Sequence, residues 1–232
     1  MGKRVISVAN IIEDGRIGGP QIRIVEVAKA LLRDQRSEAI AEFDITDNDK
    51  CIETTVIFPK YDSYDFQKKL ESYEIPFIRL PLHRPSKSWK YLLQYMLWFP
   101  LEILILQTVL KKNQFDLVHV SGGSWQIKGA IAGKLAGCRV LWHLNDTKIP
   151  GIIRAFFGPV AGLCASGFIV AGQRVKNYYL EDSKLGVRKP VFEIQAPVDC
   201  NYFDPQNINP DESISEIEAI KIASVGNVSP IK

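Results

Sequence analysis

The stretch from Arg4 to Leu32 most constrains the fold, because a strand, a glycine-rich turn and a helix are predicted there in succession. Residues 4–9 are short, apolar and rich in β-branched side chains, which predicts a strand buried on both faces. The turn ends at Pro20, which suits the first turn of a helix because its missing N–H costs nothing there. Apolar residues then recur on one helical face at Ile24, Val27, Ala28 and Leu31.

The turn itself is a candidate anion site. Gly18 and Gly19 carry no side chains, so a ligand can approach the backbone N–H groups at the start of the helix. Those N–H groups and the helix dipole favour an anion such as a phosphate. The alternative is a tight strand-to-helix turn that needs glycine only for its backbone angles. The turn lacks the G-x-G-x-x-G pattern of dinucleotide sites, which argues against a nucleotide-dependent oxidoreductase.

Length, charge and cysteine spacing narrow the class of protein. The chain has 232 residues, 46% of them hydrophobic, which is ample for a packed α/β domain. A formal net charge of +3 is too small to indicate a nucleic-acid partner. The four cysteines lie far apart, so their spacing predicts neither a zinc site nor disulfides and favours a reducing compartment such as the cytoplasm. The first apolar run ends at Asn10, so no signal peptide is expected.

Strand and helix patterns alternate along the rest of the chain. Residues 34–50 are polar without a clear period, which predicts a surface loop or a short β-excursion. Further strands are predicted at residues 54–58, 77–80, 115–120, 139–144, 167–171 and 191–194, with helical patterns between them. This alternation predicts an α/β fold, a Rossmann-like open and mostly parallel sheet with helices on both faces.

Ligands of such sheets bind beyond the carboxyl ends of the strands. Residues suited to binding fall at those ends, namely Gly18, Gly19, Ser121, Gly122, His143 and Gly172. Asp146 also follows a strand and could serve as a base, although a polar residue there usually only caps or turns the chain. His143 has the alternative of a satisfied histidine at a strand end, and His119 lies inside a strand, where a structural role is expected.

The stretch from Trp89 to Leu110 is the most hydrophobic part of the chain. As a helix it would measure about 33 Å, enough to cross a hydrocarbon core of about 30 Å. It also holds Glu102, and a carboxylate near mid-bilayer costs about 2.5–3.5 kcal/mol, which disfavours a spanning helix. Two interpretations remain open: a core helix, or a helix that meets a membrane surface or a lipid-linked substrate through residues 84–112. In the second, aromatic residues near Arg84, Lys87 and Lys90 would point partly outward, namely Trp89, Tyr91, Tyr95, Trp98 and Phe99.

The end of the chain predicts a second domain. Residues 207–218 are polar and acidic, which is typical of a linker after a first domain at residues 1–206. Residues 219–226 then form a buried-type strand pattern, so residues 219–232 are expected to open a C-terminal domain that this sequence does not contain.

Several separated motifs together resemble the N-terminal, acceptor-side half of the family 4 glycosyltransferases, which are retaining enzymes of the GT-B fold. The similar stretches cover essentially the whole chain: Gly18-Gly19-Pro20 with Val25, Ala28 and Leu31-Leu32; residues 115–120; Trp142-His143; residues 196–199 with 203–205; and residues 225–227 with 230–232. The sequence departs from the family pattern at Asn227, where an arginine is usual, and at Ala196-Pro197, where Asn-Gly is usual.

The resemblance implies transfer of a sugar from a nucleotide-sugar donor to a polysaccharide or lipid-linked acceptor, with retention and without a metal or other cofactor. It assigns Gly18 and Gly19 to the loop beside the donor phosphate and the acceptor, and His143 to the donor-sugar region. Lys232 would match a basic residue that meets the diphosphate. Ser121, Gly122 and Asp146, at neighbouring strand ends, join the expected donor and acceptor site.

In the family, the second domain binds the nucleotide, so this chain alone is expected to be inactive. A protein of this kind would be cytoplasmic, with the inner face of the membrane as its expected place if residues 84–112 touch lipid. The alternative function is a non-catalytic module that holds a glycan, or that works beside a separate subunit supplying the donor domain.

Overall fold

The computed structural model describes residues 4–36, 50–84, 89–145, 147, 151–181, 188–200, 203, 204 and 206. The chain divides into two compact units, Met1–Pro197 and Val198–Lys232, and the fold below is that of the first. The predicted linker at residues 207–218 and the predicted opening of a second domain at residues 219–232 lie outside the described residues.

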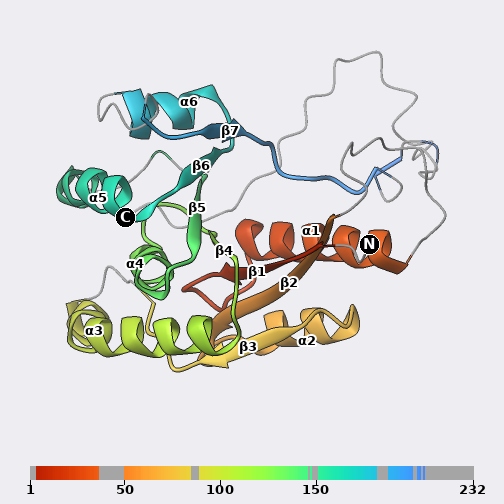
Figure 1. The fold of residues 1–232 in the computed structure, drawn as a ribbon, viewed down its shortest axis with the longest axis horizontal. Coiled ribbons are helices and arrows are strands. Elements are labelled where there is room, and N and C mark those ends of the chain that lie inside the picture. Colours follow the sequence, from red (N-terminus) through yellow and green to blue (C-terminus); the bar gives the residue numbers. More distant parts are fainter. Residues whose placement is uncertain are drawn as a thin grey trace, which may run out of the picture. The chain divides into compact units, whose positions relative to one another are not determined.

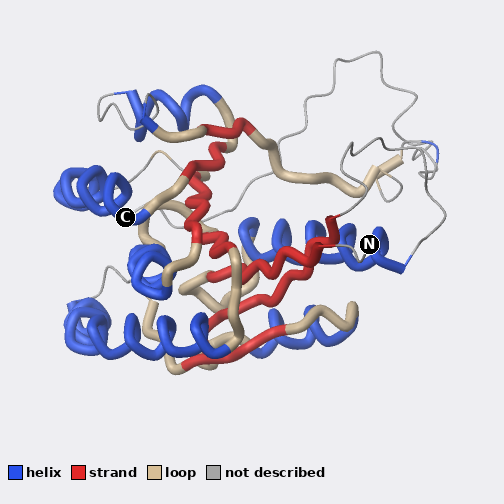
Figure 2. The backbone as a smooth tube through the Cα atoms, in the orientation of Figure 1, coloured by secondary structure: helices blue, strands red, loops and turns tan. Residues whose placement is uncertain are grey.

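The first unit is built on a seven-stranded parallel sheet with the order β3-β2-β1-β4-β5-β6-β7 (Figures 1 and 2). The strands are β1 (Arg4–Ile11), β2 (Lys50–Pro59), β3 (Phe77–Leu80), β4 (Leu117–Val120), β5 (Arg139–Leu144), β6 (Gly167–Val170) and β7 (Val191–Glu193). The helices are α1 (Gly19–Arg36), α2 (Tyr64–Ser72), α3 (Trp89–Lys112), α4 (Ile127–Ala136), α5 (Gly151–Cys164) and α6 (Gln173–Lys176), which continues as the π-helix η1 (Asn177–Glu181). The predicted α/β class is therefore confirmed.

Helices cover both faces of the sheet, and on each face a cluster of buried apolar side chains packs between the helices and the sheet. The larger cluster joins α3, α4 and α5 to one face, through side chains such as Leu106, Ala130 and Phe157. The smaller cluster joins α1 and α2 to the other face, through Ile24 and Phe66 among others. In β2, Ile57 belongs to the larger cluster and Val56 and Phe58 to the smaller one, because side chains alternate along a strand.

The first strand differs in part from the expectation of burial on both faces. The segment Val8–Ile11 is buried, but Val5 is 48% exposed and the next two residues are half-buried. The strand β2 also begins earlier than predicted, at Lys50, where it pairs with Arg4. The exposed start of β1 therefore lies at the amino edge of the sheet, away from the carboxyl edge where ligands are expected.

Helix α4 lies unusually close to the sheet at Gly133. A β-carbon there would come within 2.8 Å of Val140 Cγ2 and 3.2 Å of the side chain of Val118. Both valines belong to the core beneath the helix, so neither can move aside without disturbing it. Glycine at this position sets the distance between α4 and the sheet, and thereby the position of every residue on α4.

We expect Gly133→Ala to lower the free energy of unfolding by about 1–3 kcal/mol, because it overpacks this contact. The matched control is Gly158→Ala in α5, where a β-carbon meets nothing within 4 Å. That control should leave stability unchanged or raise it by about 0.5–1 kcal/mol, because alanine favours a helix over glycine. Urea denaturation of both variants measures the difference, and equal effects would contradict the close contact.

Candidate functional site

The strand order creates a crevice at the carboxyl end of β1. The chain leaves β1 toward β2 on one side, while it leaves the adjacent β4 toward β5 on the other. The loops after β1 and β4 therefore diverge, and such switch points are the usual ligand sites of open α/β sheets. The loop after β1 leads to Gly18 and Gly19, and the loop after β4 contains Ser121 and Gly122.

Arg23 of helix α1 links these loops to β5. Its Nη2 donates a hydrogen bond of 2.6 Å to Ser121 Oγ, and its Nη1 lies 3.0 Å from His143 Nε2. Burial lowers the pKa of the Arg23 guanidinium to about 10, so the group stays positively charged at neutral pH. Within the described part of the chain, no carboxylate lies within ion-pair distance of this guanidinium. Arg23 is thus a partly buried cation whose described partners are both neutral.

The same contact fixes the hydrogen-bonding state of two histidines. Because Arg23 can only donate, His143 Nε2 must accept and the ring proton must sit on Nδ1, which lies 3.3 Å from His119 Nε2. His119 Nδ1 in turn donates to Asn10 Oδ1, and Asn10 donates to Thr54 Oγ1. The result is a directed chain of hydrogen bonds that begins at Arg23 and crosses β5, β4, β1 and β2.

Both histidines in this chain are neutral. Burial, the Arg23 charge and His119 lower the pKa of His143 to about 2. Burial and the Arg23 charge lower the pKa of His119 to about 4. Neither ring can therefore act as a cationic acid near neutral pH, and the Nε2 lone pair of His143 accepts the hydrogen bond from Arg23.

The structure brings several of the predicted site residues to this crevice. Gly19 begins helix α1, and a β-carbon there would meet nothing within 4 Å, so its backbone is open to a ligand. Gly122 has a φ of +113°, which favours glycine, and a β-carbon there would come within 2.9 Å of Gln126 Nε2. Ser121 and His143 are buried and joined through Arg23. Asp146 and Lys232 lie outside the described residues.

A buried cluster of charged side chains connects the loop that follows β1 to helix α4. Lys128 of α4 is fully buried, with its Nζ 2.5 Å from Glu102 Oε2 and 3.4 Å from Glu13 Oε2. Its ammonium also lies 4.2 Å from the ring centre of Tyr95 and donates to the backbone carbonyl of His83. Burial raises the pKa of the Glu13 carboxyl against the opposing effect of Lys128. Glu13 Oε1 accepts the backbone N–H groups of residues 128 and 129, which caps the start of α4.

This cluster ties three parts of the chain together. Glu13 follows β1, Glu102 lies in the middle of α3, and Lys128 lies in the first turn of α4. Glu102 Oε1 also accepts the backbone N–H of His83 at 2.9 Å and contacts His83 Nδ1. The carboxylate of Glu102 therefore holds both the segment after β3 and helix α3 against α4.

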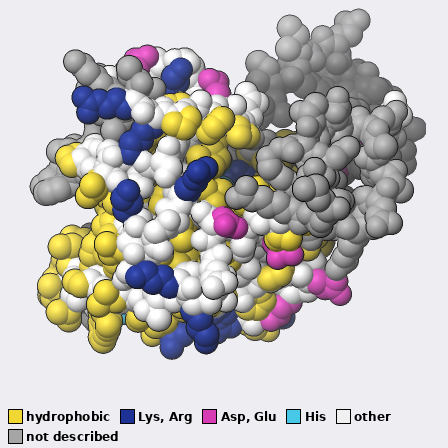
Figure 3. Space-filling view, in the orientation of Figure 1, with side chains coloured by type: hydrophobic (Ala, Val, Ile, Leu, Met, Phe, Trp, Pro, Cys, Tyr) yellow, Lys and Arg dark blue, Asp and Glu magenta, His cyan; other side chains and the backbone are white. Residues whose placement is uncertain are grey.

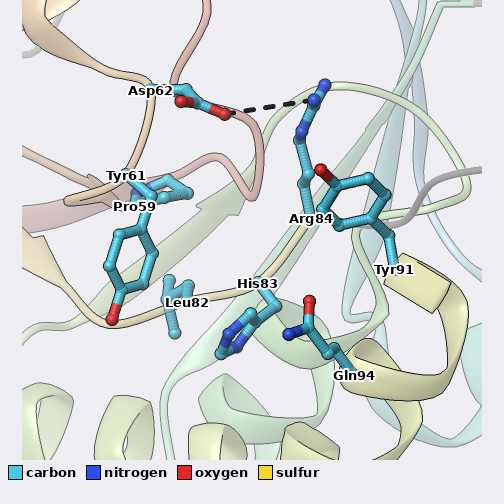
Figure 4. A pocket seen from close by; sticks show the side chains of 9 residues that line it. Pro59, Tyr61, Asp62, Leu82, His83, Arg84, Tyr91 and Gln94 are labelled. Atoms are coloured by element: carbon cyan, nitrogen blue, oxygen red, sulfur yellow. Dashed lines mark ion pairs between the residues drawn. The ribbon is translucent and has the colours of Figure 1, made fainter.

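A small cavity lies on the other side of the loop after β1, at the carboxyl ends of β2 and β3. Its volume is about 190 Å³, and its lining residues are Gly15, Pro59, Tyr61, Asp62, Leu82, His83, Arg84, Tyr91 and Gln94. Figure 4 shows their side chains around the cavity, with the ion pair between Asp62 and Arg84 on one side and the ring of Tyr61 on another. Sites for drug-sized ligands have volumes of about 300–1,000 Å³, so this cavity suits a single ring.

The lining of this cavity combines aromatic rings with balanced charges. The His83 ring lies 5.7 Å from the Tyr61 ring and is stacked on Trp98 at 6.0 Å. Arg84 lies 4.0 Å from Asp62 and 3.9 Å from Asp14, so its charge is offset by two carboxylates. Asp62 also has a φ of +50°, which is uncommon for a residue other than glycine. Such a cavity fits a small, uncharged ligand rich in hydroxyl groups.

The sequence did not predict the side chains that hold the crevice and the cavity in place. Arg23 lies in a helix for which the sequence pattern identified only the apolar face. No sequence motif includes Arg23. The buried charges of Glu13, Glu102 and Lys128 are far apart in the sequence and meet only through the strand order. Across the described ranges, no group of three or more His, Cys, Asp and Glu side chains is arranged to hold a metal ion.

Comparisons with known proteins find likeness in structure alone. No family model and no curated protein matches the sequence. A glycosyltransferase from Rickettsia africae has a similar structure, with a TM-score of 0.62 and 19% identity over 90% of this chain and 48% of that one. HepE of Anabaena, solved in complex with UDP, gives a TM-score of 0.59 and 20% identity over 87% of this chain and 47% of the other. The Rossmann-like α/β fold of this chain is therefore similar to about half of each of these glycosyltransferase structures.

The same fold occurs with another reaction. A putative UDP-N-acetylglucosamine 2-epimerase from Listeria monocytogenes gives a TM-score of 0.51 and 13% identity over 78% of this chain and 43% of that one. The chain spans about half the length of the glycosyltransferase structures it resembles. The fold alone therefore does not decide which reaction takes place, because the reaction depends on the residues of the site.

The buried charge cluster generates a prediction of stability. Lys128→Met removes the cation and leaves Glu13 and Glu102 buried without it, which should lower the free energy of unfolding by about 3–5 kcal/mol. Lys134→Met changes an exposed lysine of the same helix and should leave stability nearly unchanged. Chemical denaturation compares the two, and a Lys128 variant as stable as the control would show that the cluster is not a constraint.

The neutral histidines generate a prediction of pH dependence. The pKa of His119 is about 4 in the folded protein and near 6.5 in the unfolded chain, so only the unfolded chain binds this proton between those pH values. Stability should therefore fall as the pH is lowered from 6.5 to 4, by up to about 1.4 kcal/mol per pH unit for each such group. His119→Asn removes one titrating group, and its denaturation profile should be flatter than that of the natural protein in this window. Parallel profiles would contradict the buried neutral state.

Proposed function

We propose that this chain is the acceptor-side part of a retaining glycosyltransferase of the family 4 type. In this proposal, a nucleotide-sugar donor places its diphosphate at the crevice after β1 and β4, and an acceptor sugar occupies the cavity beside it. The observation that carries the proposal is Arg23, a partly buried cation at the switch point with no described carboxylate to offset it. An anionic group is the ligand that such a site most favours.

The positive charge suits the chemistry of sugar transfer. When the bond between the sugar and the diphosphate breaks, negative charge develops on the leaving phosphate oxygen, and a guanidinium held in place can stabilise it. The backbone of Gly18 and Gly19 at the start of α1 would provide further donors to the same phosphates. In this proposal protein groups offset the charge without a metal ion or other cofactor, so a chelator should not affect transfer.

His143 has a role in the donor region that depends on Arg23. In the structure its Nε2 accepts from Arg23 and its Nδ1 donates to His119, so both ring nitrogens are occupied. When the Arg23 guanidinium binds a diphosphate instead of His143, Nε2 becomes free to accept a hydrogen bond from a hydroxyl group of the donor sugar. Because the ring stays neutral, His143 orients the sugar by a hydrogen bond and transfers no proton itself.

The cavity supports the proposal of transfer over a reaction on the donor alone. Epimerisation changes one sugar and needs no second substrate, whereas transfer needs a place for an acceptor. The aromatic rings and the offset charges of Asp62 and Arg84 suit the apolar face and the hydroxyl groups of one sugar ring. We therefore favour transfer to a polysaccharide or lipid-linked acceptor.

Two predicted site residues enter the proposal from the sequence alone, Lys232 through the family resemblance and Asp146 through its place after a strand. Lys232 would contact the diphosphate, and Asp146 would face the donor or the acceptor. The chain spans about half of the glycosyltransferases it resembles, so we expect residues 1–232 alone to transfer no sugar. The alternative is a non-catalytic glycan-binding module, or a subunit that works beside a separate donor-binding protein.

We expect Arg23→Gln to weaken the binding of UDP by about tenfold or more, because it removes a charged donor to the diphosphate. Arg79→Gln, at an exposed arginine of β3 whose described partner is Gln67, is the matched control and should bind UDP as the natural protein does. Phosphorus NMR titration with UDP measures both affinities. Equal affinity of the Arg23 variant and the natural protein would refute the diphosphate site.

A further inference from the structure

Helix α3 carries a continuous apolar stripe on its outward side. The stripe consists of Trp89, Leu93, Leu97, Leu101 and Leu104, which are 76%, 61%, 74%, 45% and 54% exposed. Their spacing of three or four residues places them on one side of the helix. Figure 3 shows hydrophobic side chains gathered at the lower left, where Figure 1 draws the start of α3. Large exposed apolar patches are rare on soluble proteins and mark interaction surfaces.

The opposite side of α3 is fixed to the domain. Tyr95, Leu106 and Leu110 are buried there, and Glu102 is bonded to Lys128 and His83. Within the described ranges, the segment Tyr91–Lys112 is long and apolar enough to cross a membrane by length and composition. Spanning would require the helix to leave this core and to break the contact of Glu102 with a buried ammonium. The helix can therefore offer only its outward side to another surface.

The structure corrects one part of the sequence expectation for this helix. Trp89, Tyr91 and Trp98 are exposed as predicted, but Tyr95 is buried and Phe99 is half-buried. Phe99 packs against the edge of the Tyr95 ring, at a distance of 5.5 Å between the ring centres. The core interpretation thus holds for the inner side of the helix, while the outer side is left apolar.

The charges around the stripe indicate which surface it fits. Glu102 is the single acidic residue of α3 and it is buried, so the outward side carries no negative charge of its own. The helix ends in the exposed residues Lys111 and Lys112, and Lys134 lies in the last turn of α4. Gln107 donates to the carbonyl of Leu135, which brings these two helix ends together. One end of the stripe is therefore cationic, while the other end carries Trp89 and Tyr91.

We propose that the outward side of α3 docks on an anionic lipid bilayer, with the helix lying in the plane of the interface. Apolar side chains on one side, lysines toward anionic headgroups and amphipathic aromatic rings at the boundary are the features of interfacial helices. The lysines at the end of the stripe, together with the lack of an acidic side chain on the outward side of α3, match anionic headgroups better than a protein surface of mixed charge. The protein would thus be peripheral at the cytoplasmic face of a membrane, whose leaflet is anionic.

If the proposed function holds, docking of α3 on a bilayer would also determine which class of acceptor reaches the cavity. Tyr91 and Gln94 belong to the first turns of α3 and line the cavity proposed for the acceptor sugar. The cavity therefore borders the stripe and would lie at the level of the headgroups. This arrangement favours a lipid-linked acceptor over a soluble polysaccharide.

Sedimentation with lipid vesicles tests the docking surface. The natural protein should sediment with vesicles of phosphatidylcholine mixed with phosphatidylglycerol. Replacing both Leu93→Ser and Leu97→Ser should weaken this partitioning by about tenfold or more, because two exposed leucines no longer enter the bilayer. The control Tyr64→Ser, at a residue that is 66% exposed on α2, should partition as the natural protein does. Circular dichroism checks that all three proteins are folded alike.

A second pair of substitutions tests the charge. Lys111→Gln with Lys112→Gln should weaken binding to the anionic vesicles by about fivefold per lysine and leave binding to phosphatidylcholine alone unchanged. No sedimentation of the natural protein, or unchanged partitioning of the leucine variant, would overturn the proposal. So would a dimer in solution that the leucine variant abolishes, because the stripe would then bind a second copy. These measurements need neither donor nor acceptor, so their failure is distinct from a failure of UDP binding or of sugar transfer.

Discussion

The buried ammonium of Lys128 is the constraint on which the rest of the structure depends. It holds two carboxylates from different parts of the chain, Glu13 after β1 and Glu102 in α3, in a place without water access. Removing the ammonium would leave both carboxylates buried without their cation, so Lys128 ties the loop after β1, helix α3 and helix α4 together. The positions of the crevice, the cavity and the exposed stripe all follow from this assembly.

The crevice and the cavity lie on opposite sides of the same loop and differ in charge. Arg23 makes the crevice cationic, and burial together with the Arg23 charge lowers the pKa of His143 and of His119, so both rings are neutral. In the cavity, Asp14 and Asp62 offset the charge of Arg84. A nucleotide sugar is anionic at one end, and an acceptor sugar is uncharged, so the two places match the two substrates of a transfer reaction. Helix α3 joins the cavity to an apolar surface, which connects the proposed chemistry with a membrane.

The sequence predicted the sheet because the alternation of strand and helix patterns depends on local residues. It also placed Gly18 and Ser121 after strands and His143 near the end of one, and the structure has all three toward the carboxyl edge of the sheet. Arg23 could not be found in this way, because its partners are set by the order of β1, β4 and β5. The expected outward orientation of Tyr95 was wrong for a related reason. A helix that is apolar nearly all round gives no periodic signal, and the buried partners of Glu102 decide which side faces inward.

Acceptor-dependent transfer by the intact native protein is the most direct test of the central claim. Labelled UDP-sugars would be incubated with and without a lipid extract from the source cells. The account predicts release of UDP and movement of the label into the extract, with the anomeric configuration retained and no turnover without the extract. Hydrolysis or epimerisation of the donor that proceeds equally without an acceptor would contradict it.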